Sequence, residues 1–121
     1  MLQVIVAGGR DFTSEKNYEM MKSWLLYFFK DLFPHHIEIV SGMAAGADSL
    51  AIRFAKEFGL PVREFPADWK RYGKSAGYKR NVQMAIYADA CVCFWDKRSK
   101  GTKHMINIAK EHDLKLRVVK Y

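Results

Sequence analysis

The sequence predicts an α/β fold: a five-stranded, all-parallel sheet in the order 3-2-1-4-5, covered by helices on both faces as a three-layer sandwich. Strand-like and helix-like patterns alternate five times along the 121 residues, which is typical of a parallel sheet. Right-handed crossovers leave few topologies, and the order 3-2-1-4-5 places the first and fourth strands at a switch point where ligands bind. The length fits one compact domain, so we expect residues 1–121 to form a single domain.

An apolar run and a cap define the first strand and helix. Residues 2–7 precede Gly8 and Gly9, which predicts the central strand. Thr13 or Ser14 then supplies the N-cap of a helix that ends at Pro34. Its predicted core face has five apolar residues at helical spacing: Met21, Trp24, Leu25, Phe28 and Leu32. A second stripe, made of Leu26, Phe29 and Phe33, is covered either by deeper burial or by another subunit, and we expect a homodimer through this helix.

A glycine-containing segment, residues 41–51, follows the apolar strand at residues 37–40. A turn of this kind at a helix start exposes backbone N–H groups and the positive end of the helix dipole, so it suits a phosphate. Its spacing matches neither the dinucleotide-binding fingerprint nor the Walker loop. The alternative is a tight connection in which Gly42 and Gly46 take unusual backbone angles and Asp48 caps the helix.

The remaining elements follow from similar patterns. The second helix, residues 47–58, is closed by Gly59, with Pro61 beyond it. The other expected elements are a strand at 61–65, a short helical turn and irregular loop at 70–76, a helix at 78–87, a strand at 90–95, a loop at 96–102, a helix ending near His112 and a last strand at 116–119.

The charge is uneven along the chain. Residues 61–121 contain fourteen Lys and Arg against six Asp and Glu, whereas residues 1–60 contain six against seven. The basic residues gather in two clusters: Lys70, Arg71, Lys74, Lys79 and Arg80, and Lys97, Arg98, Lys100 and Lys103. The clusters are either a solvated surface or a site for an acidic partner, and nucleic acid is one such partner.

Several function classes are not expected. The sequence has no apolar run of about 18 residues and no charged leader, so we expect neither a membrane partner nor processing. Cys91 and Cys93 alternate on one strand, which favours free thiols and a cytoplasmic location. The four histidines, His35, His36, His104 and His112, lack metal-ligand spacing, so we expect no metal and no cofactor.

Five motifs in order resemble the YspA-type, YpsA-related branch of the SLOG superfamily. They are Gly8-Gly9-Arg10-Asp11-Phe12, Ser41-Gly42-x-Ala44-x-Gly46-Ala47-Asp48, Phe65-Pro66-Ala67-Asp68-Trp69, Ala76-Gly77-x-x-Arg80-Asn81, and Phe94-Trp95-Asp96 followed by Ser99-Lys100-Gly101-Thr102. The resemblance implies a Rossmann-like domain that binds a nucleotide or a nucleotide derivative. Its better-known relatives divide between enzymes and DNA-binding proteins.

Two groups of relatives correspond to the two alternative functions, enzyme and DNA-binding protein. The lonely-guy phosphoribohydrolases cleave a base from a nucleoside monophosphate with an arginine and a glutamate, and their motifs are similar to residues 77–84 and 97–105. Arg80 falls on the arginine, but Met105 falls on the glutamate, and a thioether cannot accept a proton. The DNA-processing protein of transformation, which binds single-stranded DNA, has a loop similar to residues 41–48.

The predicted site lies where the loops after strands 1, 2 and 4 converge. The expected ligand-binding residues are Gly8, Gly9, Arg10, Asp11, Ser41, Gly42, Gly46, Asp48, Arg80, Asn81, Ser99, Gly101 and Thr102. The two arginines suit phosphate oxygens, although each is open to an ion-pair role instead. Three aromatic residues, Trp69, Tyr72 and Tyr78, either stack on a base or pack beneath the loop.

The leading interpretation is a domain that senses or sequesters a nucleotide-derived small molecule. Hydrolysis of an N-glycosidic or phosphoester bond is the enzymatic alternative, with Arg80, Asp48 and Asp96 as catalytic candidates and none singled out. Binding of single-stranded nucleic acid is the second alternative.

Overall fold

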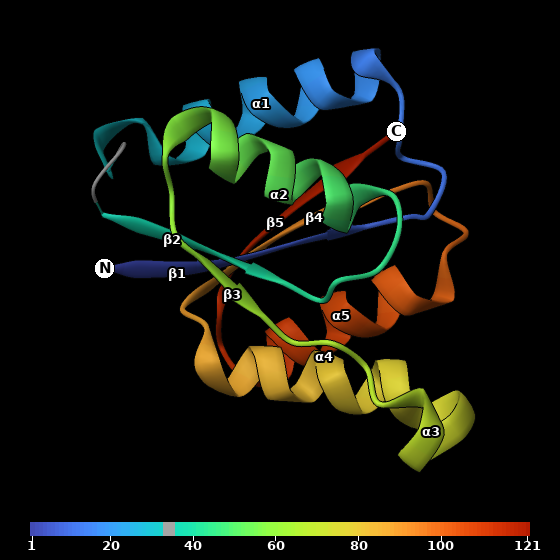
Figure 1. Ribbon diagram of the computed structural model, residues 1–121. Helices are drawn as coiled ribbons and strands as arrows, with labels where there is room; N and C mark the ends of the chain where they lie inside the picture. Colours follow the sequence, from blue (N-terminus) through green and yellow to red (C-terminus); the bar gives the residue numbers. More distant parts are fainter. Residues whose placement is uncertain (33–35) are drawn as a thin grey trace.

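The computed structural model describes residues 1–32 and 36–121. Within these residues five strands form one parallel sheet in the order β3-β2-β1-β4-β5, which confirms the predicted fold class and strand order (Figure 1). The strands are β1 Leu2–Gly8, β2 Ile37–Ser41, β3 Val62–Glu64, β4 Ala90–Trp95 and β5 Lys115–Lys120. The central strand β1 pairs with β2 on one side and with β4 on the other, so the switch point lies between β1 and β4.

Helices cover both faces of the sheet, α1 and α2 on one and α4 and α5 on the other (Figure 1). They span α1 Glu15–Phe29, α2 Ala47–Phe58, α3 Trp69–Tyr72, α4 Ala76–Tyr87 and α5 Lys100–Glu111, with 3-10 turns η1 Lys30–Leu32 and η2 Gly73–Ser75. Ser14 caps α1 through a reciprocal capping box with Asn17. Gly59 adopts the left-handed conformation that ends α2, as predicted.

Alternate residues of the central strand build two halves of the core. Val4 and Val6 belong to the cluster that includes Phe54 of α2, whereas Ile5 belongs to the cluster that includes Met84 of α4. This alternation is the period-2 geometry of a strand buried on both faces. The core therefore fixes β1, and with it the loop that leaves its carboxyl end.

The predicted core face of α1 is partly wrong. Trp24 is 39% exposed, and Tyr18 is buried instead. The ring of Tyr18 packs in the core while its hydroxyl donates a hydrogen bond to Glu57, so burial leaves its polar end satisfied. Leu26 and Phe29 pack partly against the core, as the deeper-burial alternative required. The predictions for Phe33, Pro34 and His35 fall outside the described residues.

The short helical turn predicted within residues 70–76 is present as α3, but the irregular loop expected after it is wrong, because the 3-10 turn η2 and the start of α4 follow directly. Asp68 caps α3 by accepting from the N–H of Arg71, and the Ser75 hydroxyl donates to the Tyr72 carbonyl through the η2 turn. Gly73 has a φ of +56°, which lets the chain turn between these short helices. As a result α4 begins at Ala76, and its first turn lies beside the carboxyl end of the sheet (Figure 1).

None of the helices in residues 1–32 and 36–121 has the length and apolar character needed to span a membrane. Cys91 and Cys93 are buried free thiols whose sulfur atoms lie 3.5 Å apart on one face of β4.

Candidate functional site

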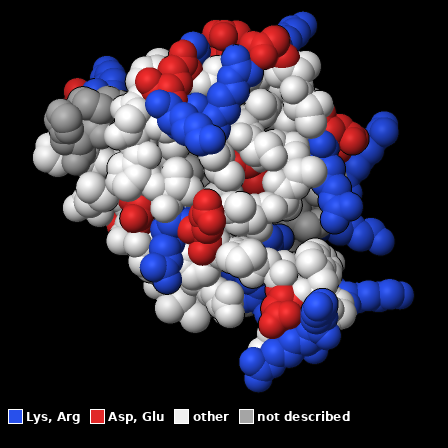
Figure 2. All heavy atoms as spheres, viewed as in Figure 1, with Lys and Arg blue, Asp and Glu red and all other residues white. Residues whose placement is uncertain are grey.

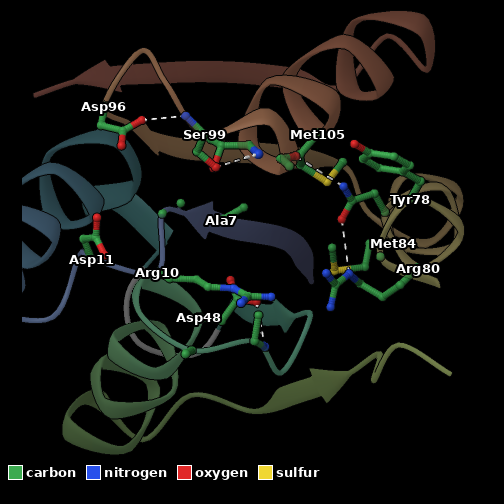
Figure 3. Close-up of a pocket in the computed structure, with 18 of the residues that line it drawn as sticks. Ala7, Arg10, Asp11, Asp48, Tyr78, Arg80, Met84, Asp96, Ser99 and Met105 are labelled. Atoms are coloured by element: carbon green, nitrogen blue, oxygen red, sulfur yellow. Dashed lines mark hydrogen bonds between the residues drawn. The ribbon is translucent and has the colours of Figure 1, made fainter. Parts of the chain in front are cut away.

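A cavity of about 590 Å³ lies at the switch point between β1 and β4. It is lined by the end of β1 and the loop that follows (residues 7–11), the loop after β2, the first turns of α4 and the loop between β4 and α5 (Figure 3). The three loops that the sequence predicted to converge therefore do so, and α4 closes one side.

The loops after β1 and β2 are in close contact beside the cavity. Gly46 has a φ of +79°, and a Cβ there would overlap the Gly9 carbonyl oxygen and lie 2.6 Å from the Arg10 Cα. Gly42, in contrast, has no positive φ, and Met43 takes that conformation at +60°, so the expected unusual angle is correct for Gly46 and wrong for Gly42. Gly42 is instead adjacent to Arg80, whose Nη1 would lie 2.7 Å from an added Cβ.

Asp48 does not cap α2, so that expectation is wrong. Gly46 is the N-cap residue and no side chain caps this helix, while Asp48 Oδ2 accepts a hydrogen bond from the Ala44 N–H at 3.0 Å. Burial raises the pKa of Asp48 to about 6, although the Ala44 N–H and the Arg80 charge oppose the rise. The carboxyl thus holds the loop after β2 and leaves the N–H groups at the start of α2 without a side-chain partner.

Hydrogen bonds to two neighbours fix the side chain of Arg80. Its Nη1 donates to the Gly42 carbonyl and its Nε donates to Asn81 Oδ1 at 3.2 Å. The Asn81 amide nitrogen faces the Gly101 carbonyl at 3.5 Å and His104 Nδ1 at 3.0 Å. Because that amide nitrogen is a donor, Nδ1 of His104 must be the acceptor, which places the ring proton on Nε2. Burial lowers the pKa of His104, which favours this neutral ring.

The loop before α5 is held by its own side chains. Asp96 Oδ1 accepts from the N–H groups of Arg98 and Ser99, each at 2.8 Å, and these bonds hold its pKa below the usual value. Ser99 caps α5: its hydroxyl accepts from the Thr102 N–H at 3.3 Å and from the Thr102 hydroxyl at 3.0 Å. Asp96 therefore stabilises the loop before α5 through its Oδ1 atom.

The structure brings ten of the thirteen predicted ligand-binding residues to the cavity: Gly8, Gly9, Arg10, Asp11, Asp48, Arg80, Asn81, Ser99, Gly101 and Thr102. The other three predicted residues, Ser41, Gly42 and Gly46, do not line this cavity. Ser41 is buried and its hydroxyl accepts from the Met43 N–H, so it serves the turn.

Arg10 and Arg80 differ in their surroundings. Arg10 is exposed and forms no ion pair within the described part of the chain. Figure 3 shows it reaching in from the loop after β1 while Arg80 reaches in from α4, with the two guanidinium groups turned toward each other in this view. The ion-pair interpretation of Arg10 has no support in these residues.

Two aromatic side chains at the rim were open to a stacking or a packing role. Trp69 is 52% exposed and Tyr78 is 46% exposed, and both line the cavity, so neither is packed beneath a loop. The Tyr78 ring lies 4.4 Å from the His104 ring, centroid to centroid. Tyr72 instead packs against Lys79, whose Nζ lies 4.8 Å from its ring centroid.

Some lining residues were not among the predicted ligand-binding residues. Among them are Lys74 and Arg98, which the sequence analysis placed in the basic clusters, and Met84 and Met105. Met84 and Met105 follow Arg80 and Gly101 by four residues, which is helical spacing. Met105, which occupies the position of the expected glutamate, is only 1% exposed.

Basic side chains surround the mouth of the cavity. Figure 2 shows Lys and Arg projecting around α3 and along the edge above it. The exposed members of the two predicted clusters are Lys70, Arg71, Lys74 and Lys79, and Lys97, Arg98, Lys100 and Lys103. The residues that the structure describes contain no group of three or more His, Cys, Asp or Glu side chains arranged to hold a metal ion.

The fold and the site together define a Rossmann-like α/β structure with a cavity at the switch point of its sheet, where proteins of this architecture commonly bind ligands. The chain belongs to the YspA, cpYpsA-related SLOG family, whose profile matches residues 2–72. This confirms the resemblance drawn from the five motifs.

One protein is similar to the chain in sequence and two solved structures are similar to it in fold. The chain is 37% identical to the Gene 61 protein of Mycobacterium phage D29 over 84 residues, which is 64% of this chain and 67% of that protein. The fold is similar to that of DNA processing protein A from Streptococcus pneumoniae (TM-score 0.76, 18% identity, 98% of this chain and 50% of that one). It is also similar to that of DNA processing protein A from Helicobacter pylori, which binds single-stranded DNA (TM-score 0.66, 17% identity, 97% of this chain and 64% of that one). The chain thus spans less than two thirds of either structure.

Proposed function

We propose that the cavity at the switch point binds a nucleotide or nucleotide-derived molecule, which the protein senses or sequesters. The observation that carries this proposal is that two arginines from different elements, Arg10 and Arg80, line one cavity beside a helix start that no side chain caps. Guanidinium groups and the N–H groups at a helix N-terminus are both suited to phosphate oxygens, although the Ala47 N–H at this helix start already donates to the Gly9 carbonyl. Membership in the SLOG family supports the same class of ligand.

Other lining residues suit the remainder of a nucleotide. Asp11 is exposed at the rim and has the acceptors for ribose hydroxyls. The exposed faces of Trp69 and Tyr78 are suited to stack on a base.

Calorimetry with nucleoside mono- and diphosphates, ADP-ribose and NAD tests the proposal. Arg10→Ala is the sharpest variant, since Arg10 is exposed and no ion pair is lost with it. A charged hydrogen bond is worth about 1.5–3 kcal/mol, so we expect affinity to fall about tenfold or more. The matched control is Arg117→Ala, an exposed arginine on β5 outside the cavity. No binding of any of these compounds at millimolar concentration would refute the proposal.

Hydrolysis within the same cavity is the second candidate, and the state of Asp48 favours it. This carboxyl is 7% exposed, lines the cavity and has a pKa near 6, as a general base at neutral pH requires. Asp48→Asn should abolish release of base or ribose phosphate while binding persists. If chromatography detects no product from any compound in the panel, this candidate is rejected.

A third candidate, binding of single-stranded nucleic acid, draws on the basic rim. Affinity should fall with salt at a slope of about 0.7 per phosphate contact. Charge reversal at Lys70, Arg71, Lys97 and Lys100 should remove strand binding and spare nucleotide binding. Equal loss of both would show that the rim and the cavity are one surface.

We also propose a homodimer through α1. Trp24 and Tyr27 are 39% and 66% exposed and pack with Phe28 into an aromatic surface on this helix. An exposed apolar patch of this kind is typical of an interface, and identical copies most often pair the same patch.

A further inference from the structure

A second compartment of about 340 Å³ adjoins the main cavity. Residues 42–45 after β2 and Pro66 and Ala67 after β3 bound it. Five residues line both spaces: Arg10, Ala44, Ala45, Trp69 and Arg80. Because the boundary is shared in this way, the two compartments form one continuous cleft across the ends of β4, β1, β2 and β3.

The two compartments differ in chemistry. The main cavity contains the carboxyl groups of Asp11, Asp48 and Asp96, the hydroxyl groups of Ser99 and Thr102, and the cationic side chains of Lys74 and Arg98. Apart from the shared arginines, the second compartment is lined only by glycine, alanine, methionine, proline and tryptophan side chains. Met43 and Trp69 are 44% and 52% exposed there. Such a surface is suited to a flat ring with few hydrogen-bonding demands.

Both arginines lie on the boundary between the compartments. The guanidinium of Arg80 is held by Gly42 and Asn81, and that of Arg10 carries no ion pair in the described residues. Two cations at the junction favour a linker with two negative charges over a linker with one.

We propose that the cleft takes a pyrophosphate-linked dinucleotide, with one nucleoside in each compartment and the pyrophosphate between Arg10 and Arg80. This inference rests on the proposed nucleotide-binding function and adds the class of ligand. The nucleoside with the greater hydrogen-bonding demand lies in the main cavity, beside the carboxyl and hydroxyl groups. The second ring lies against Trp69 and Met43.

Calorimetry with AMP, ADP-ribose and NAD tests the second compartment. ADP-ribose shares the pyrophosphate and lacks the second base, so the gain of NAD over ADP-ribose measures the second ring. We expect NAD to bind at least tenfold more tightly than AMP and more tightly than ADP-ribose. Ala67→Trp fills the second compartment from a residue that does not line the main cavity. It should reduce NAD affinity to the level of AMP and leave AMP within twofold.

Two further variants guard against an effect on folding. Ala67→Phe adds a smaller ring at the same position and should give an intermediate loss. Ile86→Trp adds the same indole at a residue of α4 that is 71% exposed and lines neither compartment, and it should change no affinity.

The outcomes separate this inference from the proposed function. If AMP binds and NAD binds no more tightly, the dinucleotide is wrong and the nucleotide site stands. If no compound binds, both are wrong. If the thymidine dinucleotide pTpT, which has a phosphodiester linker, matches NAD and is equally sensitive to Ala67→Trp, the pyrophosphate assignment is overturned in favour of a nucleic acid strand.

Discussion

Gly46→Ala should destabilise the protein in two separable ways. The backbone at Gly46 has a φ of +79° and a ψ of −124°, a region that residues with a side chain rarely occupy, at a cost of about 1–3 kcal/mol. The new Cβ would also overlap the Gly9 carbonyl oxygen and lie 2.6 Å from the Arg10 Cα. Both neighbours are backbone atoms, so the two loops must separate, and such overpacking costs about 1–3 kcal/mol more. The sum is a large part of the roughly 5–15 kcal/mol that stabilises a typical domain.

Gly73→Ala is the matched control. Gly73 has a similar backbone, with a φ of +56° and a ψ of −133°, and an added Cβ there would meet nothing within 4 Å. It should lose only the backbone part, about 1–3 kcal/mol. Urea denaturation followed by circular dichroism measures both variants. Equal destabilisation would refute the argument that the loops after β1 and β2 touch through Gly46.

Three further predictions concern single groups. Burial raises the pKa of Asp48 from 3.8 to about 6, so the folded state binds the proton more tightly and the free energy of unfolding falls as pH rises from about 4 to 6. Asp48→Asn should remove this fall and should be more stable than the wild type at pH 7, by up to about 3 kcal/mol in urea denaturation. A variant with the same pH profile as the wild type would contradict this prediction. The pKa of His104 lies below 6.5, so its ring should remain neutral with the proton on Nε2 at pH 7, and nitrogen NMR that finds a doubly protonated ring contradicts the Asn81 contact. Light scattering should find a dimer that Tyr27→Glu dissociates, while a monomeric wild type excludes the α1 interface.

Much of the fold could be predicted because its signals are local. Strands β1, β2 and β4 appear as short, largely apolar runs, and Gly59 marks the end of α2. The switch point then follows from the order of strands and the handedness of crossovers. The position of the candidate site was therefore available from the sequence.

The errors arise where distant parts of the chain decide the outcome. Trp24 has the spacing of the predicted core face yet is exposed, and the hydroxyl of the buried Tyr18 has its partner, Glu57, on α2, which is distant in sequence. Likewise, no local pattern could show that Asp48 binds the Ala44 N–H rather than a helix start. The chain of contacts from His104 through Asn81 to Arg80 joins two helices and was invisible in the sequence.

Under the proposed function, the two arginines of the cleft should contribute to affinity by different routes. Arg80 is already held by Gly42 and Asn81 in the free protein, so the entropy of ordering its side chain is lost during folding and not on binding. Arg10 is exposed and without an ion pair in residues 1–32 and 36–121, so the proposed ligand would have to order it on binding. If the proposed nucleotide binds, Arg80 should therefore fix where its phosphate lies, while Arg10 should adapt to the bound molecule. Because the loop after β2 both holds Arg80 through Gly42 and contacts the Arg10 backbone through Gly46, a shift of that one loop should weaken both contacts together.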